Sequence, residues 1–286
     1  MKPAKFEYTK PASIEEALSL LTESGDDAKV LAGGQSLVPM MNLRLMRPER
    51  IVDINGLSSE RFVHIEDNAI NIGMLARHAD FENNSALDAK LPVLGHVVKD
   101  IAHRAIRNRG TFAGSLSHND PSAEWPLMAV LLDAEITLQN AESTRQLTAK
   151  DFLVSYLTTA LEPDELLCNV SIPVPDANWG WAFTEFNRRL GDFAIASAAA
   201  FIGLKDGQIE HARLALGGVD YTAHRQTDVE AMLIGEVPND ELWAEAGALV
   251  SKTVDPSSDL QATAMFRRHL SNELTQRVLT EAAQNV

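Results

Sequence analysis

A pair of adjacent glycines closes a short apolar segment near the N-terminus, in the stretch AKVLAGGQS. Residues 28–31 predict a short strand, and Gly33-Gly34 ends it. Glycine adopts positive φ angles and has no Cβ, so the chain can turn sharply and approach a ligand closely there. Gln35 and Ser36 add donor side chains, and successive backbone amides in such a turn form a nest for an anion. From this stretch alone, a plain strand-to-loop turn is the simpler interpretation.

A second stretch, RNRGTFAGSLSHNDPSAEWP, combines small residues and hydroxyl groups in the same way. Small residues let a backbone approach a ligand, and hydroxyl groups offer hydrogen bonds. The residues concerned are Gly110, Thr111, Ala113, Gly114 and Ser115. His118 lies within this stretch, where ligand contact and a structural role are both open interpretations. Two such stretches in one chain favour a phosphate-rich ligand more than either does alone.

Two acidic residues follow in the same stretch. Asp120 and Glu124 lie one helical turn apart at the start of a helix expected over 122–134. Carboxylates in this position cap a helix and complement its dipole. They can also accept hydrogen bonds from the hydroxyl groups of a ligand. The sequence leaves both interpretations open.

A third candidate is FNRRLGDFAIA, in which Arg188 and Arg189 precede a Gly191-Asp192 turn. One interpretation is a hairpin with a solvated basic turn and a local Arg–Asp pair. The other places an arginine or the aspartate near a cofactor ring or at a partner interface. Neither interpretation is excluded by the residues themselves.

Several classes of protein are disfavoured. The chain has no G-x-G-x-x-G opening a helix, no P-loop and no G-x-S-x-G elbow. A formal net charge of -15 disfavours general nucleic-acid binding, and no window approaches the roughly 18 apolar residues of a membrane span. The single Cys168 excludes an intramolecular disulfide or a cysteine-ligated cluster within this chain alone. His96 and His103 lie seven apart on one expected helix, so we predict no metal site. We expect no secretory signal and a cytoplasmic location.

The hydrophobic pattern predicts an α+β chain. We expect helices over 13–25, 91–108 and 122–134 and strands over 28–31 and 50–54, with hairpins turning at Asp67-Asn68 and 141–143. Strands over 180–189, 192–204 and 208–219 and helices over 223–234, 239–251 and 260–283 are expected to follow. Proline and polar residues cluster at 173–178, which indicates a boundary there.

The quoted stretches together strongly resemble the FAD-binding medium subunit of the molybdenum hydroxylases, the family of xanthine dehydrogenase, carbon monoxide dehydrogenase and quinoline 2-oxidoreductase. The resemblance covers essentially the whole chain, including FEYTKPASIEEALSLL, IVDI, PDELLCNVSIPVP and RRLGDFAIASAAA. It implies a two-subdomain FAD-binding module of the vanillyl-alcohol-oxidase type, followed by a C-terminal three-stranded antiparallel sheet with three helices. The expected divisions are residues 1–57 and 58–175 for the two FAD-binding subdomains and 176–286 for the flavoprotein C-terminal domain.

The resemblance also implies where FAD binds. Residues 32–36 and 111–115 would hold the pyrophosphate, so a branched side chain at Gly33 or Gly114 would be expected to block it. Asp120 and Glu124 would face the ribityl and nearby hydroxyl groups. The implied cofactor-binding residues are Ala32, Gly33, Gly34, Gln35, Ser36, Leu37, Thr111, Ala113, Gly114, Ser115, His118, Asp120, Glu124, Leu167, Arg188 and Asp192. Two positions depart from the family pattern. Ala113 replaces a glycine of the usual T-x-G-G, and the strand AFTEFN lacks a lysine found in some relatives.

The resemblance implies a role in electron transfer. A small partner subunit with two [2Fe-2S] clusters would supply electrons, and a large subunit with the molybdenum-pterin cofactor would hydroxylate the substrate. FAD in this chain would pass the electrons to an external acceptor, and no catalytic base is expected here. The assembly would be a dimer of heterotrimers. The wording of the second stretch is closest to subunits of N-heterocycle hydroxylases.

Two other hypotheses remain. The chain could be a free-standing FAD oxidoreductase with its own substrate pocket, which predicts turnover by the isolated chain. It could also be a non-catalytic binding or assembly protein whose glycine stretches are only turns. Absence of bound FAD in the purified chain would support the last hypothesis.

Overall fold

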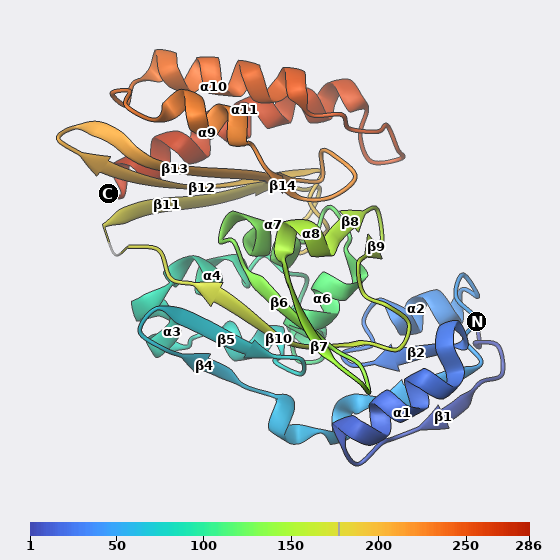
Figure 1. Cartoon of the computed structure of the whole chain (residues 1–286). Coiled ribbons are helices and arrows are strands. Elements are labelled where there is room, and N and C mark those ends of the chain that lie inside the picture. Colours follow the sequence, from blue (N-terminus) through green and yellow to red (C-terminus); the bar gives the residue numbers. More distant parts are fainter. Residues whose placement is uncertain (177) are drawn as a thin grey trace.

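Three larger β-sheets and a two-stranded one organise the described part of the chain, which comprises residues 1–176 and 178–286 of the computed structural model (Figure 1). The boundary expected at 173–178 includes Ala177, which lies outside the described residues. The N-terminal sheet lies beside the central sheet, and the C-terminal sheet with its helices forms the opposite end of the molecule (Figure 1).

The N-terminal sheet is parallel, with the strand order β1-β3-β2. Its elements are β1 (Glu7–Thr9), α1 (Ile14–Ser24), β2 (Ala28–Leu31), α2 (Leu37–Asn42) and β3 (Arg50–Asp53). The helix expected at 13–25 is confirmed, and Ser13 caps it by accepting a hydrogen bond from the Glu16 amide at 3.2 Å. The expected strands β2 and β3 are confirmed too. Strand β1 is an addition that the residue pattern did not predict.

The central sheet is antiparallel, with the strand order β4-β5-β10-β6-β7. Its strands are β4 (Val63–Ile65), β5 (Ala69–Gly73), β6 (Glu135–Gln139), β7 (Thr144–Thr148) and β10 (Leu166–Pro173). Both hairpins expected from the period-2 patterns are confirmed. The middle strand β10 buries Val170 and Ile172 completely, because it has a strand on each side and helices against its face.

Short helices and a small hairpin surround the central sheet. They are α3 (Ser85–Lys90), α4 (Pro92–Val97), α5 (Arg104–Arg107), α6 (Phe112–His118), α7 (Glu124–Leu131), α8 (Ala149–Phe152), β8 (Leu153–Ser155) and β9 (Thr158–Thr159). The 3₁₀ helices of the described residues are η1 (Gly25–Asp27), η2 (Ile54–Gly56), η3 (Ser58–Glu60) and η4 (His78–Phe81). The single helix expected over 91–108 is wrong. The chain breaks between α4 and α5, where Ala102 has a φ of 45° that no α-helix allows.

The C-terminal sheet is antiparallel and consists of β11 (Trp179–Phe186), β12 (Ala196–Lys205), β13 (Gln208–Gly217) and the short β14 (His224–Arg225). Helices α9 (Thr227–Leu233), α10 (Asp240–Thr253) and α11 (Ala264–Gln284) cover its outer face (Figure 1). The strand β14, which pairs with β13, is an addition to the three expected strands. For this reason α9 starts at Thr227, later than the expected residue 223.

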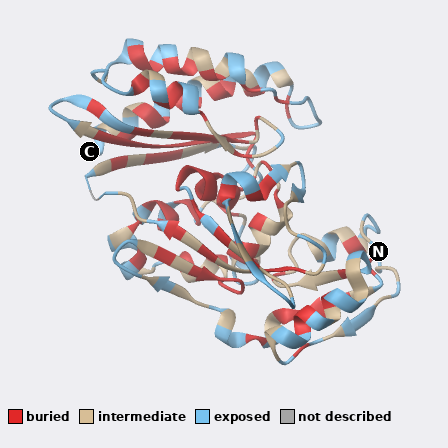
Figure 2. Cartoon of the chain, in the orientation of Figure 1, coloured by how far each residue is buried: buried red, intermediate tan, exposed pale blue. Residues whose placement is uncertain are grey.

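The two faces of the C-terminal sheet contact different parts of the molecule. Ala182 and Ala198 belong to the apolar cluster under the C-terminal helices, whereas Phe183 and Phe201 belong to the cluster of the central part. Helix α7 lies between this sheet and the central sheet, and every one of its residues is buried (Figure 2). This packing explains why α7 is apolar on all sides.

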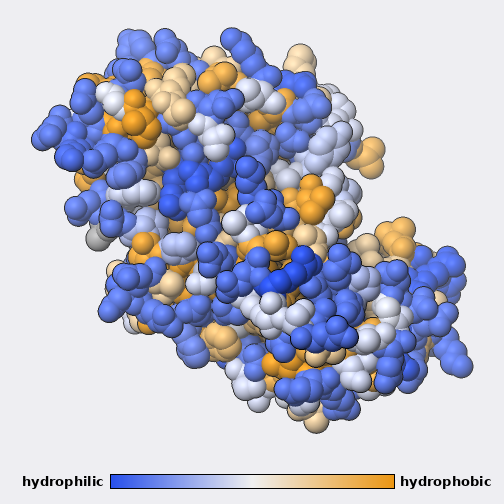
Figure 3. All heavy atoms as spheres, in the orientation of Figure 1, coloured by the Kyte–Doolittle hydropathy of each residue, from blue (hydrophilic) through white to orange (hydrophobic). Residues whose placement is uncertain are grey.

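The molecular surface is mostly hydrophilic and is hollowed where the N-terminal lobe meets the rest of the molecule (Figure 3). Among the described residues, no helix has both the length and the apolar character that a membrane crossing requires.

Candidate functional site

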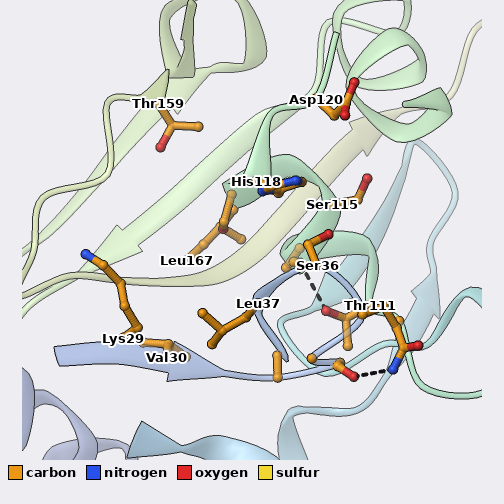
Figure 4. Close-up of a pocket in the computed structure, with 18 of the residues that line it drawn as sticks. Lys29, Val30, Ser36, Leu37, Thr111, Ser115, His118, Asp120, Thr159 and Leu167 are labelled. Atoms are coloured by element: carbon orange, nitrogen blue, oxygen red, sulfur yellow. Dashed lines mark hydrogen bonds between the residues drawn. The ribbon is translucent and has the colours of Figure 1, made fainter. Parts of the chain in front are cut away.

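A cavity of about 690 Å³ lies where the N-terminal sheet meets the central part (Figure 4). Its volume falls within the range of about 300–1,000 Å³ typical of ligand sites. Both small-residue stretches line it, one after the N-terminal strand β2 and the other at the start of α6 in the central part. All the predicted site residues line it except Arg188 and Asp192: they are Ala32, Gly33, Gly34, Gln35, Ser36, Leu37, Thr111, Ala113, Gly114, Ser115, His118, Asp120, Glu124 and Leu167.

The first stretch lines the cavity and contains backbone amides without an acceptor among the described residues. Gly34 has a φ of 71°, a conformation that favours glycine, and it turns the chain from β2 toward α2. Within the described residues, the amides of Gly34, Gln35, Ser36 and Leu37 have no hydrogen-bond acceptor. The Gln35 side chain was expected to offer a donor to a ligand. It donates from Nε2 to the Gly33 carbonyl at 2.8 Å instead and therefore braces the loop.

The two stretches touch each other through Gly33. A Cβ atom at this position would lie 2.6 Å from the Arg109 carbonyl oxygen and 2.7 Å from the Gly110 Cα. The Arg109 carbonyl oxygen also accepts a hydrogen bond from the Arg77 guanidinium, which fixes the direction of this carbonyl group. We expected a side chain at Gly33 to obstruct a ligand directly. The nearest obstruction is the partner loop, so the missing Cβ first of all lets the two loops close.

The second stretch is helical from Phe112 rather than an open loop. Thr111 caps α6, because its Oγ1 accepts a hydrogen bond from the Gly114 amide at 3.1 Å. A Cβ on Gly114 would lie 2.5 Å from that hydroxyl oxygen, so the glycine preserves the cap. The Ala113 amide, at the second position of the helix, has no acceptor within the described residues. Ala113 has no positive φ, so its methyl group is compatible with the local backbone.

The acidic end of the cavity contains Asp120 and Glu124. Asp120 accepts a hydrogen bond from the Ser122 amide at 2.9 Å, and it precedes α7 rather than lying within it. Glu124 is only 5% exposed, and burial, with the nearby charges of Asp100 and Asp120, raises its pKa to about 7. A large fraction of its carboxyl groups is therefore neutral at pH 7.

Burial also shifts the pKa values of the two histidines that line the cavity, His78 and His118. It lowers the pKa of His118, although Asp120 nearby acts in the opposite direction. His78 is 6% exposed, and burial, with the charges of Arg107 and Arg77, lowers its pKa to about 4. Its Nδ1 accepts a hydrogen bond from the Trp125 indole at 2.8 Å. Both imidazoles are therefore expected to be neutral at pH 7.

The wall opposite the glycine stretches was not predicted. It includes Thr158 and Thr159 of the small hairpin, close to Leu167 of β10. Asn119 holds this hairpin, because its Nδ2 donates to the carbonyls of Ser155 at 2.7 Å and Thr158 at 2.8 Å. The signal in the sequence was weak: an asparagine favours the left-handed conformation, and Asn119 has a φ of 48°.

Other lining residues were also missed. Lys29 of β2 contributes a cation at one end, and Gly191 and Phe193 reach the cavity from the connection between β11 and β12 (Figure 4 labels Lys29). Gly191 has a φ of 84°, and a Cβ there would lie 2.6 Å from the Ala102 carbonyl oxygen. Through this close contact, the β11–β12 connection packs against Ala102, where the chain breaks between α4 and α5.

The expected places of Arg188 and Asp192 need correction. Neither residue lines the cavity. Arg188 Nη2 donates to the carbonyls of Leu260 at 3.2 Å and Gln261 at 2.8 Å, because the connection folds over the segment before α11. Strand β11 ends at Phe186, so the two residues lie in an irregular connection and not in a regular hairpin turn.

Comparison with known proteins identifies the family. Residues 4–175 match the FAD binding domain in molybdopterin dehydrogenase, and residues 181–282 match the CO dehydrogenase flavoprotein C-terminal domain. The chain belongs to the FAD-binding medium subunits of the molybdenum hydroxylases. It is an FAD-dependent oxidoreductase subunit, and the predicted combination of FAD-binding module and flavoprotein C-terminal domain is confirmed.

Relatives in this family are similar over their full length. The 6-hydroxypseudooxynicotine dehydrogenase complex subunit alpha of Paenarthrobacter nicotinovorans is 38% identical over 99% of this chain and 96% of its own. The caffeine dehydrogenase subunit beta of Pseudomonas sp. (strain CBB1) is 36% identical over 100% of this chain and 97% of its own. A carbon monoxide dehydrogenase structure from Hydrogenophaga pseudoflava superposes with a TM-score of 0.97 at 33% identity, covering 100% of this chain and 99% of that chain.

Proposed function

We propose that the cavity binds FAD with its pyrophosphate between the two glycine-containing stretches. The observation that carries this proposal is the set of free amides at Gly34 to Leu37 and at Ala113, which face one cavity from two subdomains. Phosphate oxygens accept hydrogen bonds from such amides without a neighbouring cation. A chain with a net charge of -15 and few cations in this cavity has need of such donors.

The other lining residues suit the remaining parts of the cofactor. Asp120 and the neutral form of Glu124 provide acceptors and donors for hydroxyl groups, and Leu167 provides an apolar contact. Ala32, Ser36, Thr111, Ser115 and His118 complete the proposed binding residues. Arg188 and Asp192 lie near the proposed site but do not line the cavity, so we do not propose them as direct FAD contacts.

Bound FAD supplies two-electron and one-electron transfer, and the residues of this chain bind it, orient it and exclude water. We propose that its electrons come from [2Fe-2S] clusters of a small partner subunit. Cys168 is the chain's single cysteine, so a cysteine-ligated cluster must lie on another polypeptide. A large subunit with a molybdenum-pterin cofactor would complete a heterotrimer, two heterotrimers would associate, and an external acceptor would reoxidise FAD in the cytoplasm.

We further propose that the complex hydroxylates a small N-heterocyclic substrate. The caffeine dehydrogenase relative supports this class by its name, although the carbon monoxide dehydrogenase structure is nearly as similar in sequence. Caffeine and carbon monoxide therefore form a suitable pair for comparison in an activity assay of the purified complex.

We propose the domain divisions 1–57, 58–175 and 176–286 for this chain. Separate sheets in the three segments support them, as do the two family models, which meet between residues 175 and 181. Expression of residues 1–175 alone tests the main division. Retention of FAD by this fragment would support it, and an insoluble or unfolded fragment would contradict it.

The full chain provides the main test. We expect the purified chain to be yellow, to release about one FAD per chain on denaturation, and to show no turnover of caffeine without its partners. Turnover by the isolated chain would favour a free-standing oxidoreductase. Absence of FAD both after purification and after incubation with added FAD would contradict the proposed site.

A further inference from the structure

Strand β11 directs Glu185 toward the FAD-binding part of the molecule. Side chains alternate between the two faces of a strand. Trp181 and Phe183 face the central part, where their rings lie 5.4 Å and 6.4 Å from the ring of His96. Ala182 faces the C-terminal helices. Glu185 shares the parity of Trp181 and Phe183, so its carboxyl group faces the central part and α7.

Two buried polar atoms lie on this face without a hydrogen-bond partner among the described residues. Within the described residues, neither Glu185 Oε2 nor Ser197 Oγ has a hydrogen-bond partner, and Ser197 is 0% exposed. The two residues are opposite each other in the β11–β12 pair, so their side chains are neighbours. The other carboxyl oxygen of Glu185 accepts a hydrogen bond from Asn187 Nδ2 at 2.7 Å. Buried polar groups are rarely left without a hydrogen-bond partner, so Glu185 Oε2 and Ser197 Oγ are candidates for a functional role.

The segment just before α7 packs against this sheet beside Ser197. Ser197 is also opposite Gly217, whose missing Cβ would lie 2.7 Å from Ser197 Oγ and 3.1 Å from the Pro121 carbonyl oxygen. The Gly218 amide donates to the same Pro121 carbonyl at 2.7 Å. The sheet thus touches the residues just before Glu124, the carboxyl group that lines the FAD cavity. Among the described residues, no other side chain donates a hydrogen bond to the Glu124 carboxyl group, which lines the cavity.

The carboxyl groups of Glu185, Glu124 and Asp100 lie within reach of one another's charge. Burial, with the charges of Glu124 and Asp100, raises the pKa of Glu185 to about 8, while the hydrogen bond from Asn187 acts in the opposite direction. Burial also raises the pKa of Asp100, although His96, Lys99 and Arg107 oppose this effect. Asp100 and Asp120 act on Glu124, Asp100 and Glu124 act on Glu185, and His96, Lys99 and Arg107 act on Asp100.

We propose that Glu124 and Glu185, together with the Ser197 hydroxyl, form a proton-binding site that takes up one proton when the FAD in the cavity is reduced. The proposal rests on the proposed FAD site. Reduction adds negative charge to the cavity, and a negative charge beside a carboxylate favours its protonated form. Glu124 couples the cavity to this proton-binding site, because its carboxyl group belongs to the site and also lines the cavity.

The balance of the step is simple. Two electrons enter FAD from a reductant, which is the iron–sulfur partner in the complex or dithionite in a test. FAD would take up its own proton from solvent on reduction, and one further proton from solvent forms an O–H bond to a carboxylate oxygen of Glu124 or Glu185, which becomes a carboxylic acid. Reoxidation by an acceptor removes the two electrons, and the same O–H bond breaks to release the proton.

The test compares the pH dependence of the FAD midpoint potential in the wild-type full chain and in Glu185→Gln between pH 7 and 9.5. One additional proton per two electrons makes the potential steeper by about 30 mV per pH unit. We expect this additional slope in the wild type and its loss in Glu185→Gln. A matched control is Glu210→Gln, because Glu210 is an exposed carboxylate of the same sheet that pairs with Lys205. It should keep the wild-type slope.

A second measurement is independent of the midpoint potential. The infrared difference spectrum of the reduced minus the oxidised wild-type chain should gain a carboxylic-acid C=O band, and this band should be absent in Glu185→Gln. Equal slopes in wild type and Glu185→Gln, or a spectrum without that band, would overturn the inference while leaving FAD binding intact. A wild-type chain that binds no FAD would instead overturn the proposed function on which the inference rests.

Discussion

Gly33 lies against the carbonyl group of Arg109, and a Cβ atom on this glycine would be 2.6 Å from that oxygen. Contacts under 3.0 Å to a backbone atom force one of the two segments to move. The glycine therefore sets the distance between the two stretches that line the cavity. This contact joins the N-terminal sheet to the central part at the proposed pyrophosphate site.

We expect Gly33→Val to lose FAD, because its side chain separates the two loops and the free amides no longer face one another. Gly207→Ala is a suitable control. Gly207 has a φ of 80°, and a Cβ added there would have no atom within 4 Å, so alanine should cost about 1–2 kcal/mol of stability without changing FAD affinity. The FAD-to-protein absorbance ratio after gel filtration measures the effect. Wild-type FAD content in Gly33→Val would disprove the role of this contact.

Substitutions at Gly114 and Thr111 should have coupled effects on the free energy of unfolding. Gly114→Ala places a methyl group against the capping hydroxyl of Thr111, and Thr111→Ala removes that hydroxyl and about 1 kcal/mol of helix capping. In the double variant the clash is absent, so its loss of stability should be smaller than the sum of the two single losses. Urea unfolding of the four proteins gives the coupling free energy. Strict additivity would show that the two groups do not contact.

Ala113→Gly restores the residue usual in the family but should not improve FAD binding. Ala113 is 3% exposed in α6 and does not have a positive φ, so glycine brings no conformational benefit. Glycine should reduce the free energy of unfolding by about 1 kcal/mol, because it is a poorer helix former. Fluorescence titration of the FAD-free chain gives the affinity. A large increase in affinity would indicate that the methyl group obstructs the cofactor.

Asn119→Ala should weaken both the fold and FAD retention. Asn119 is fully buried, and its amide satisfies the carbonyls of Ser155 and Thr158 in the hairpin that lines the cavity. Loss of these hydrogen bonds from the partly exposed hairpin costs about 0.5–1.5 kcal/mol for each bond. Asn140→Ala, at an exposed turn, is the control and should have a much smaller effect. Thermal unfolding and FAD content test the prediction, which an unchanged midpoint would refute.

His78 should contribute to acid sensitivity. Its pKa is about 4 in the folded chain, below the ordinary 6.5, so protonation favours the unfolded state. The associated stability is present above pH 6.5 and is lost as the pH falls toward 4, by an amount on the order of 3 kcal/mol. In His78→Gln the side chain remains neutral and can still accept the Trp125 hydrogen bond. Urea unfolding at pH 7 and pH 4.5 should show a smaller loss for this variant. Equal losses would assign acid sensitivity to other groups.

Local residue patterns accounted for much of the fold because they follow from short-range physics. Ser13 and the amphipathic residues after it specify α1, and the alternating strands around Asp67-Asn68 specify a hairpin. The two small-residue stretches also predicted one shared cavity, because the residues that permit close backbone approach are few. The family resemblance extended this local information to the cofactor and the fold.

Other features depended on contacts between distant segments. Periodicity predicted one helix over 91–108, but the chain turns at Ala102, where Gly191 from the C-terminal part packs against it. Strand β14 forms because its residues meet β13, and Arg188 turns away from the cavity toward the segment before α11. None of these contacts has a local signal.

The sequence by itself determined which residues could approach a phosphate-rich ligand, since glycine and hydroxyl side chains carry that property wherever they lie. Only the tertiary structure decided that Gly33 meets Arg109 before it meets a ligand, and that Glu185 Oε2 and Ser197 Oγ are buried without a hydrogen-bond partner among the described residues. The physical reason is that close approach and burial are properties of pairs of segments. Their energies depend on which segments the whole fold brings together.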